Sequence, residues 1–323
     1  MKRALVTGAS GFVGANLVRR LLRDGHETHL LVRPSHQTWR LREIAEAVRM
    51  HDVDLADKDS IFRVVAVVKP DWLFHLAAYG AYSDQTGIER MATTNLLGCA
   101  SLLDAAVKAG IEAFVQTGSS SEYGYKDHPA REEELLEPNS HYAVTKAAAT
   151  HYCQHTARKL DINAVTVRLY SVYGPYEEPS RLIPTLILHG LRGGWPPLVS
   201  PRVGRDFVFV DDAVDAILQI AAAPAIPRGA VYNICTGVQT TLGAVVEIAG
   251  RLLPIAAEPA WSTMPERAWD TDRWVGSPER MAREIGWRAQ TDFETGLRKT
   301  IDWLTKHPEW LRFYSRRLFA GTQ

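Results

Sequence analysis

Tyr142 and Lys146 are the residues whose types and spacing in this chain best suit chemistry. Side chains four apart on a helix share one face, with roughly 5–6 Å between their Cβ atoms. The lysine ammonium would then favour the phenolate and lower the pKa of the phenol from its usual value of about 10. Such a pair can exchange a proton with a sugar or alcohol oxygen while hydride moves at the carbon. Taken alone, the spacing also fits two residues on a solvated helix face.

A glycine-rich turn near the start of the chain makes the chemical interpretation stronger. Gly8, Gly11 and Gly14 directly follow a short apolar segment and precede a stretch with helical apolar spacing. A strand-to-helix turn of this kind lets the backbone approach a pyrophosphate and points a helix N-terminus at its charge. A plain connection that merely needs flexible residues is the alternative. The turn therefore predicts dinucleotide binding through Gly8, Ser10, Gly11, Phe12, Val13 and Gly14.

The elements around these residues alternate between strand and helix patterns. Strands are expected at residues 2–7, 27–32, 50–53, 71–77, 113–117 and 164–169, and helices at 16–23, 89–109 and 141–159. Such alternation is typical of an α/β fold, a Rossmann-type doubly wound parallel sheet with helices on both faces. Its ligands are expected at the carboxyl ends of the strands.

Proline and glycine become more frequent after Gly174, which indicates a second, smaller lobe. We expect residues 1–172 with 206–236 to form the NAD(P)-binding domain, with strands near 207–210 and 231–235 rejoining the sheet. Residues 173–205 with 237–323 are then expected to form a C-terminal substrate-binding lobe.

Composition excludes several classes of protein. The 323 residues are 46% hydrophobic and 23% charged, with 37 basic and 37 acidic side chains. This balance argues against disorder and against nucleic acid or an anionic membrane as the main partner. No apolar run approaches the roughly 18 residues of a membrane span. Three scattered cysteines without metal-ligand spacing suggest reduced core residues in a cytoplasmic protein and no metal site.

The motifs of the chain, taken together and in their order along the sequence, resemble those of the extended short-chain dehydrogenase/reductases of the sugar-nucleotide epimerase/dehydratase group. The resemblance runs nearly end to end, through Thr7 to Gly14, Asp54-Leu55, His75 to Ala78, Asn95, Ser119 to Gly124, Tyr142 with Lys146, Arg168 to Pro175, Arg205 to Asp212, Asn233-Ile234 and Ile285 to Trp287. It implies bound NAD(H) or NADP(H), a nucleoside-diphosphate sugar and chemistry through a ketone. It also implies a homodimer, formed by the helices at 89–109 and 141–159.

The resemblance also assigns further site residues. The family hydroxyl four residues before the Tyr of Tyr123-Gly124 corresponds to Ser119, which would hydrogen-bond the reacting sugar oxygen beside Tyr142 and Lys146. Arg205 and Arg267 match arginines that bind the substrate phosphates. Further expected contacts are Asp54, Leu55, Leu76, Ala77 and Ala78 for the cofactor and Ser120 and Ser121 for the substrate.

One departure from the family bears on the reaction. Members that eliminate water from a hexose carry an acidic pair or a glutamate two residues before the tyrosine of Tyr-Gly, which supplies the base and acid that dehydration needs. Here Ser121 occupies that place, and Glu122 comes one residue later, where an extended segment would point it to the other side. A 4,6-dehydratase is therefore not expected.

The end of the second strand bears on the cofactor. An acidic residue there binds the ribose 2′-hydroxyl of NAD, whereas an arginine accommodates the 2′-phosphate of NADP. This chain has Arg33, with Arg40 and Arg42 further along. A guanidinium pairs with a phosphate, so we expect NADP(H) in preference to NAD(H). The alternative is that Arg33 only caps the strand in solvent.

Three functions fit these residues. The first is NADPH-dependent reduction of a nucleotide-linked 4-keto-6-deoxyhexose, because the stretch Ser119 to Gly124 is similar to that of reductases of GDP-4-keto-6-deoxymannose. The second is a redox-neutral 4-epimerase, similar to the UDP-galactose 4-epimerases, because it uses the same Tyr, Lys and Ser. The third is a catalytically silent nucleotide-binding regulator. Retention of all three residues argues against the third.

Overall fold

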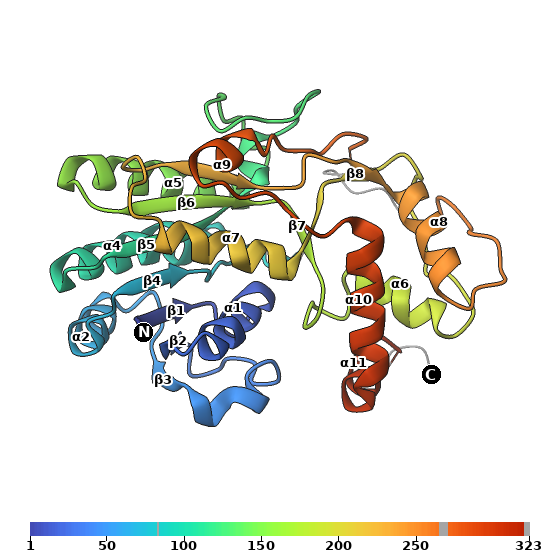
Figure 1. Cartoon of the computed structure of the whole chain (residues 1–323), viewed down its shortest axis with the longest axis horizontal. Helices are drawn as coiled ribbons and strands as arrows, with labels where there is room; N and C mark the ends of the chain where they lie inside the picture. The colour runs from blue at the N-terminus through green and yellow to red at the C-terminus, as the bar shows by residue number, and fades with distance from the viewer. Residues whose placement is uncertain (83, 265–270, 320–323) are drawn as a thin grey trace.

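A computed structural model describes residues 1–82, 84–264 and 271–319 of the chain. Its centre is a seven-stranded sheet in the order β10-β6-β5-β4-β1-β2-β3, in which every neighbouring pair is parallel (Figure 1). The strands are β1 (Arg3–Thr7), β2 (Glu27–Val32), β3 (Arg49–Asp52), β4 (Trp72–His75), β5 (Ala113–Ser119), β6 (Ala164–Leu169) and β10 (Val231–Ile234). This arrangement confirms the expected Rossmann-type fold.

Helices cover both faces of the sheet (Figure 1). A separate apolar cluster lies between each face and its helices. Because both faces are buried, the inner strands are nearly continuous apolar runs. One cluster lies beneath α1 (Phe12–Arg23), α7 (Val210–Ala222) and α9 (Glu279–Glu284). The other lies beneath α2 (Lys58–Val68), α4 (Gly98–Ala109) and α5 (His141–Leu160).

The helix expected over 89–109 consists of three consecutive segments. It starts as α3 (Ile88–Met91), widens to a π-helix over Ala92–Leu97 and continues as α4. A π-helical turn in this position is typical of a functional region. It contains Asn95, which is fully buried.

The second lobe is built from short pieces and helices. Two-stranded sheets join β7 (Ser171–Tyr173) to β9 (Phe207–Phe209) and β8 (Gly204–Arg205) to β11 (Thr240–Thr241). Aromatic and aliphatic side chains form its own core between the helices. The helices of this lobe are α6 (Leu182–Gly190), α8 (Leu242–Leu252), α10 (Phe293–Lys306) and α11 (Pro308–Phe319). Outside the lobe, the 3₁₀ helix η1 (Arg42–Ala47) lies between β2 and β3.

One strand expectation is wrong. Residues 207–210 do not rejoin the main sheet, because β9 pairs in parallel with β7, with Val172 opposite Val208. The place beside β6 belongs to β10, in which Val231 lies opposite Thr166. The strand expected at 231–235 is thus confirmed as β10. Since β6 has one free edge, only one of the two late segments can occupy it.

The glycine-rich turn is set by close packing against the end of β4. A Cβ atom on Gly8, whose φ is +70°, would lie 2.5 Å from the backbone of Leu76 and Ala77. A Cβ atom on Gly14 would overlap the carbonyl oxygen of Gly8. The first and third glycines are therefore steric requirements of this turn.

Membrane insertion through a helix finds no support in the fold. Within the three described stretches, every helix is too short or too polar to span a bilayer.

Candidate active site

Tyr142 and Lys146 lie in the first turns of α5, as their spacing predicts. The helix begins after Ser140, whose side chain accepts a hydrogen bond from the backbone N–H of Ala143 at 3.2 Å. Lys146 is almost completely buried at 1% exposure, whereas Tyr142 is partly exposed. The two side chains thus lie one helical turn apart on α5, with the lysine buried.

The expectation that Lys146 lowers the pKa of Tyr142 is wrong in this structure. Burial, which penalises the phenolate, raises the pKa of Tyr142 to about 12. A hydrogen bond with the Ser119 side chain and the charge of Arg181 oppose this rise, whereas the charge of Glu122 adds to it. Burial also lowers the pKa of Lys146, against the attraction of Glu122. Tyr142 is therefore a protonated phenol near neutral pH, suited to donating a proton.

Ser119 reaches Tyr142 from the last position of β5. Its side chain is hydrogen-bonded with that of Tyr142, so the structure brings two of the three predicted catalytic residues together. Lys146 lies one helical turn beyond Tyr142 on α5. The Ser119 hydroxyl also accepts the backbone N–H of Ser121 at 3.1 Å, which caps the 3₁₀ helix η3 (Ser120–Tyr123). Sequence reasoning treated this segment as extended. The segment is instead a 3₁₀ helix, and the Glu122 side chain is fully buried and accepts the backbone N–H of Ser119.

Asn95 holds α5 against the segment that follows β4. Its side-chain oxygen accepts the N–H of Tyr79, and its amide donates to the carbonyl of Tyr79, both at 2.8 Å. The same amide donates to the Thr145 hydroxyl at 2.9 Å, and that hydroxyl donates to the carbonyl of Tyr142. This buried side chain fixes the start of α5. The sequence marked Asn95 only as a family landmark and gave no such role.

The predicted cofactor residues also gather at the carboxyl edge of the sheet. The glycine turn abuts Leu76 and Ala77 at the end of β4, and exposed Ala78 follows them. Asp54 and Leu55 follow β3 after one intervening residue, and Leu55 is buried. The first turn of α1 has no side-chain cap and no acidic residue. Its free N–H groups and the room left by the glycines fit the pyrophosphate of a dinucleotide.

The three arginines after β2 differ in their surroundings. Arg33 is exposed at the strand end. Arg40 is buried, and its guanidinium already donates hydrogen bonds to the carbonyls of Tyr176 (2.7 Å) and Ser10 (3.2 Å). Exposed Arg42 lies over the ring of Trp310. Arg33 is therefore the arginine best placed to meet a ligand beside the second strand.

The predicted substrate residues come from the second lobe and from the segment Ser119 to Gly124, here called the serine loop. The Ser120 hydroxyl accepts the indole N–H of Trp274 at 3.0 Å. The guanidinium of Arg205 on β8 lies 5.9 Å from the Trp274 ring, so a chain of contacts joins the lobe to the serine loop. The sequence motifs assign Trp274 no role. Arg267, the other predicted phosphate ligand, lies outside the described residues.

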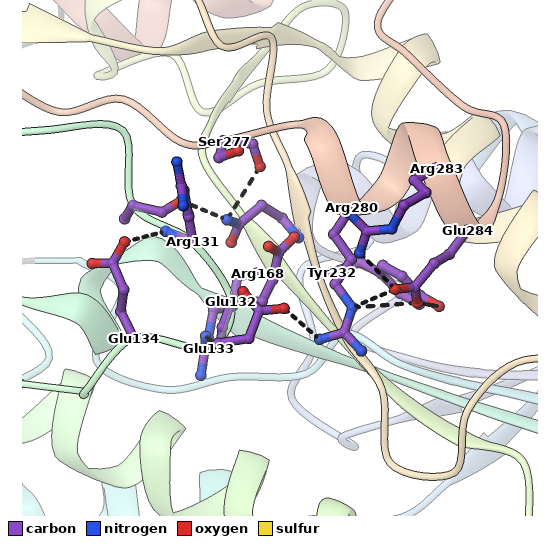
Figure 2. Close-up of polar contacts among 12 residues, drawn as sticks. Arg131, Glu132, Glu133, Glu134, Arg168, Tyr232, Ser277, Arg280, Arg283 and Glu284 are labelled. Atoms are coloured by element: carbon purple, nitrogen blue, oxygen red, sulfur yellow. Dashed lines mark hydrogen bonds and ion pairs between the residues drawn. The ribbon is translucent and has the colours of Figure 1, made fainter.

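A long loop connects η3 to α5 and is fastened to β10 and α9. Glu132 accepts the backbone N–H of Asn233 at 2.8 Å. Figure 2 shows the neighbouring Glu133 paired with Arg280, which in turn contacts Glu284 on α9. These contacts hold in place the loop between the two segments that carry Ser119 and Tyr142.

Comparison with known proteins identifies the family. A family model described as the NAD dependent epimerase/dehydratase family matches residues 4–235. The chain belongs to this family. This confirms the resemblance seen in the motifs, and the protein is an enzyme of a family whose members use NAD and act on sugar nucleotides.

Relatives of this epimerase/dehydratase-family chain catalyse different reactions. It is 32% identical over 322 residues to a dTDP-glucose 4,6-dehydratase of Streptomyces griseus, covering 95% of each chain. It is 31% identical over 316 residues to a UDP-glucose 4-epimerase of Mycolicibacterium smegmatis, covering 93% of this chain and 97% of the relative. The structure of MoeE5 in complex with UDP-glucuronic acid and NAD is similar at 30% identity, with a TM-score of 0.81 and coverage of 94% and 99%.

The segment after β7 contains a buried carboxyl group near this site. Glu177 is buried, and one of its oxygens, Oε2, has no hydrogen-bond partner. Burial raises the pKa of Glu177 from 4.5 to about 8, although the charges of Arg181 and Arg40 oppose the shift. The same Arg181 charge acts on Tyr142. Glu177 is therefore largely protonated at neutral pH.

We expect Glu177→Gln to change how stability depends on pH. The folded state holds the Glu177 proton more tightly than the unfolded state, so this residue favours unfolding increasingly as the pH rises from 4.5 to about 8. The neutral amide removes that dependence. Relative to the original protein, the variant should gain unfolding free energy with rising pH, by a few kcal/mol at pH 8. Urea unfolding at pH 5 and pH 8 measures the difference.

Glu258→Gln, at an exposed position in the second lobe, is the matched control and should show no such trend. A stability difference for Glu177→Gln that stays constant between the two pH values would contradict the raised pKa.

Proposed function

We propose that this protein is an NADPH-dependent reductase of a nucleotide-linked 4-keto-6-deoxyhexose. The observation that carries the proposal is that Ser119 contacts Tyr142, one helical turn before buried Lys146, while the only carboxylate of the serine loop is bound by Ser119 N–H and Arg168. Reduction of a ketone needs a hydride and one proton donor. It needs no carboxylate pair.

In this proposal the glycine turn of Gly8, Gly11 and Gly14 would hold NADPH, which would supply the hydride for reduction of the sugar carbonyl. Tyr142 donates the proton to the carbonyl oxygen, for which a phenol with a pKa of about 12 is in the right protonation state. Ser119 hydrogen-bonds the same oxygen and stabilises its developing charge. Lys146, buried one helical turn beyond Tyr142, would supply positive charge to the site as the proton leaves.

Dehydration, the reaction of several relatives, is disfavoured by the surroundings of Glu122. One Glu122 oxygen accepts the N–H of Ser119, and the other accepts from Thr150 and Arg168. Serines occupy the two preceding positions, Ser120 and Ser121. The loop therefore offers no free acid or base for eliminating water.

A redox-neutral 4-epimerase is the second candidate, favoured by the relative from Mycolicibacterium smegmatis. An epimerase must first remove a proton from the sugar hydroxyl, which a phenol of raised pKa does less readily. Incubation with NADPH and nucleotide-linked sugars separates the candidates. Net oxidation of NADPH supports the reductase, isomerisation without net oxidation supports the epimerase, and the absence of both reactions would contradict both candidates.

The proposal extends to the ligands and the two lobes. We infer that the substrate is a nucleoside-diphosphate sugar, with GDP-sugars favoured by the serine loop, and that Arg205 and Arg267 bind its phosphates. Residues 1–172 with 206–236 would bind the dinucleotide, and 173–205 with 237–323 the nucleotide sugar. Three buried free cysteines support work in the reducing cytoplasm.

Arg33→Asp is expected to reverse the cofactor preference. The guanidinium attracts a 2′-phosphate, whereas a carboxylate repels it and can accept from a 2′-hydroxyl. Binding of NADP(H) should weaken at least tenfold, about 1.4 kcal/mol, while NAD(H) binding is kept or improved. Calorimetric titration of both cofactors measures this. Equal affinities before and after the change would show that Arg33 takes no part; Arg42→Asp is the control.

Tyr142→Phe is expected to abolish turnover with little effect on cofactor binding, because the ring still packs but cannot give a proton. We expect a loss in kcat of about 10³-fold. Ser119→Ala removes one hydrogen-bond donor and should lose about 10²-fold, with milder effects from Ser120→Ala and Ser121→Ala. Steady-state kinetics test the series, and near-normal kcat for Tyr142→Phe would refute the mechanism.

We also propose a homodimer in which α4 and α5 pair with their copies. Leu97, the last residue of the π-helix before α4, and Val144 on α5 are large apolar side chains that are 58% and 49% exposed. Burial of such residues in an isologous four-helix interface would stabilise a dimer. Light scattering at micromolar concentration should give twice the chain mass. A monomer mass would refute the proposal, and Leu97→Lys should weaken the dimer.

A further inference from the structure

Glu122 is a fully buried carboxylate next to the site, and it accepts hydrogen bonds from Ser119, Thr150 and Arg168. Its Oε1 atom accepts the backbone N–H of Ser119 at 2.8 Å. The Ser119 side chain in turn accepts from the first turn of η3, so the two residues cap that helix reciprocally. The carboxylate thus holds the backbone of Ser119 directly.

The other oxygen joins two more elements to the same point. Oε2 of Glu122 accepts from the hydroxyl of Thr150 and from Nε of Arg168, both at 2.9 Å. Thr150 lies on α5, two helical turns beyond Tyr142, and Arg168 lies on β6. One carboxylate therefore connects the end of β5, which carries Ser119, to the helix that carries Tyr142 and Lys146.

Arg168 is itself held from its other side. Its Nη1 atom donates to the Tyr123 hydroxyl at 2.8 Å, and that hydroxyl donates to Asn233 on β10 at 2.8 Å. The same nitrogen lies 3.4 Å from the carbonyl of Glu132, and Figure 2 shows Arg168 beside this part of the loop. These contacts fix the guanidinium of Arg168, so Arg168 can hold the Glu122 carboxylate in one orientation.

The space around Glu122 is equally restrictive. A Cβ atom on Gly118 would lie 2.6 Å from Oε1 of Glu122 and 2.9 Å from Thr166. A serine side chain has a single rotatable bond before its oxygen, so the position of the Ser119 hydroxyl depends on its backbone. Any shift of that backbone moves the hydroxyl relative to the Tyr142 phenol.

We propose that Glu122, held by Arg168, is a positioning residue that sets the Ser119 hydroxyl against Tyr142 for the reaction. The inference rests on the proposed function of Ser119 and Tyr142. A buried ion pair that only stabilises the fold is the competing explanation. The two differ in whether the effect of Glu122 on catalysis passes through Ser119.

Glu122→Gln is the first variant because an amide cannot serve both donors. Its single oxygen can accept from Ser119 or from Arg168, and the NH₂ group then faces the other N–H. Thr150→Val is the matched control, since it removes a hydrogen bond to the same carboxylate and leaves the Ser119 contact intact. We expect kcat to fall about tenfold in Glu122→Gln with KM little changed, and to stay within about twofold in Thr150→Val.

A double-mutant cycle with Ser119→Ala decides the route of the effect. If Glu122 acts through the Ser119 hydroxyl, Glu122→Gln should lower kcat by less than twofold in the Ser119→Ala background. Fold losses that multiply, or a normal kcat in Glu122→Gln alone, would overturn the proposal.

A second variant guards against loss of folding. Glu122→Leu combined with Arg168→Met removes both buried charges, a replacement that proteins often accept without loss of stability. We expect a folded protein whose kcat falls at least as far as in Glu122→Gln. Wild-type kcat in this double variant would overturn the proposal.

A measurement that needs no substrate tests the positioning by Glu122 independently of the proposed function. Amide hydrogen exchange at Ser119 should accelerate in Glu122→Gln and stay unchanged in Thr150→Val. If the original protein turns over no sugar nucleotide, the proposed function fails, and unchanged exchange at Ser119 would independently overturn the positioning by Glu122. If it proves to be an epimerase, the kinetic cycle is run on that reaction.

Discussion

The parallel direction of the seven central strands is the constraint on which the rest of this structure depends. Because all seven run the same way, their carboxyl ends meet at one edge, where connecting segments are free to carry polar groups. The glycine turn follows β1, Leu76 follows β4, and Ser119 ends β5. Residues far apart in the sequence therefore gather at one edge without distortion of the sheet.

Buried polar contacts turn that gathering into a defined geometry. Asn95 joins the segment after β4 to α5, and Glu122 with Arg168 joins β5, α5 and β6. Each of these side chains has its hydrogen bonds satisfied inside the protein, which burial requires. Glu177 differs, because one oxygen lacks a partner and its pKa is raised to about 8. The site thus combines hydrogen-bonded buried groups with one nearby carboxyl group whose pKa is raised.

The same framework carries different reactions in the family, so a few side chains must decide between them. In this chain the serine loop holds hydroxyls where a dehydratase needs carboxyls, and its one carboxylate supports the backbone instead. The second lobe reaches this loop through Trp274 and Ser120. Under the proposed function, these contacts between the lobe and one short 3₁₀ helix would bear on the choice of substrate and reaction.

The sequence by itself determined the α/β class, most strand positions, the glycine turn and the helical Tyr142–Lys146 pair. These features depend on local spacing, which a single sequence displays directly. Only the tertiary structure decided that β9 leaves the main sheet, that burial raises the pKa of Tyr142, and that Glu122 faces Arg168. Each of those outcomes arises between segments distant in the chain. Edge availability, burial and ion pairing are properties of the packed fold, so no local pattern could have displayed them.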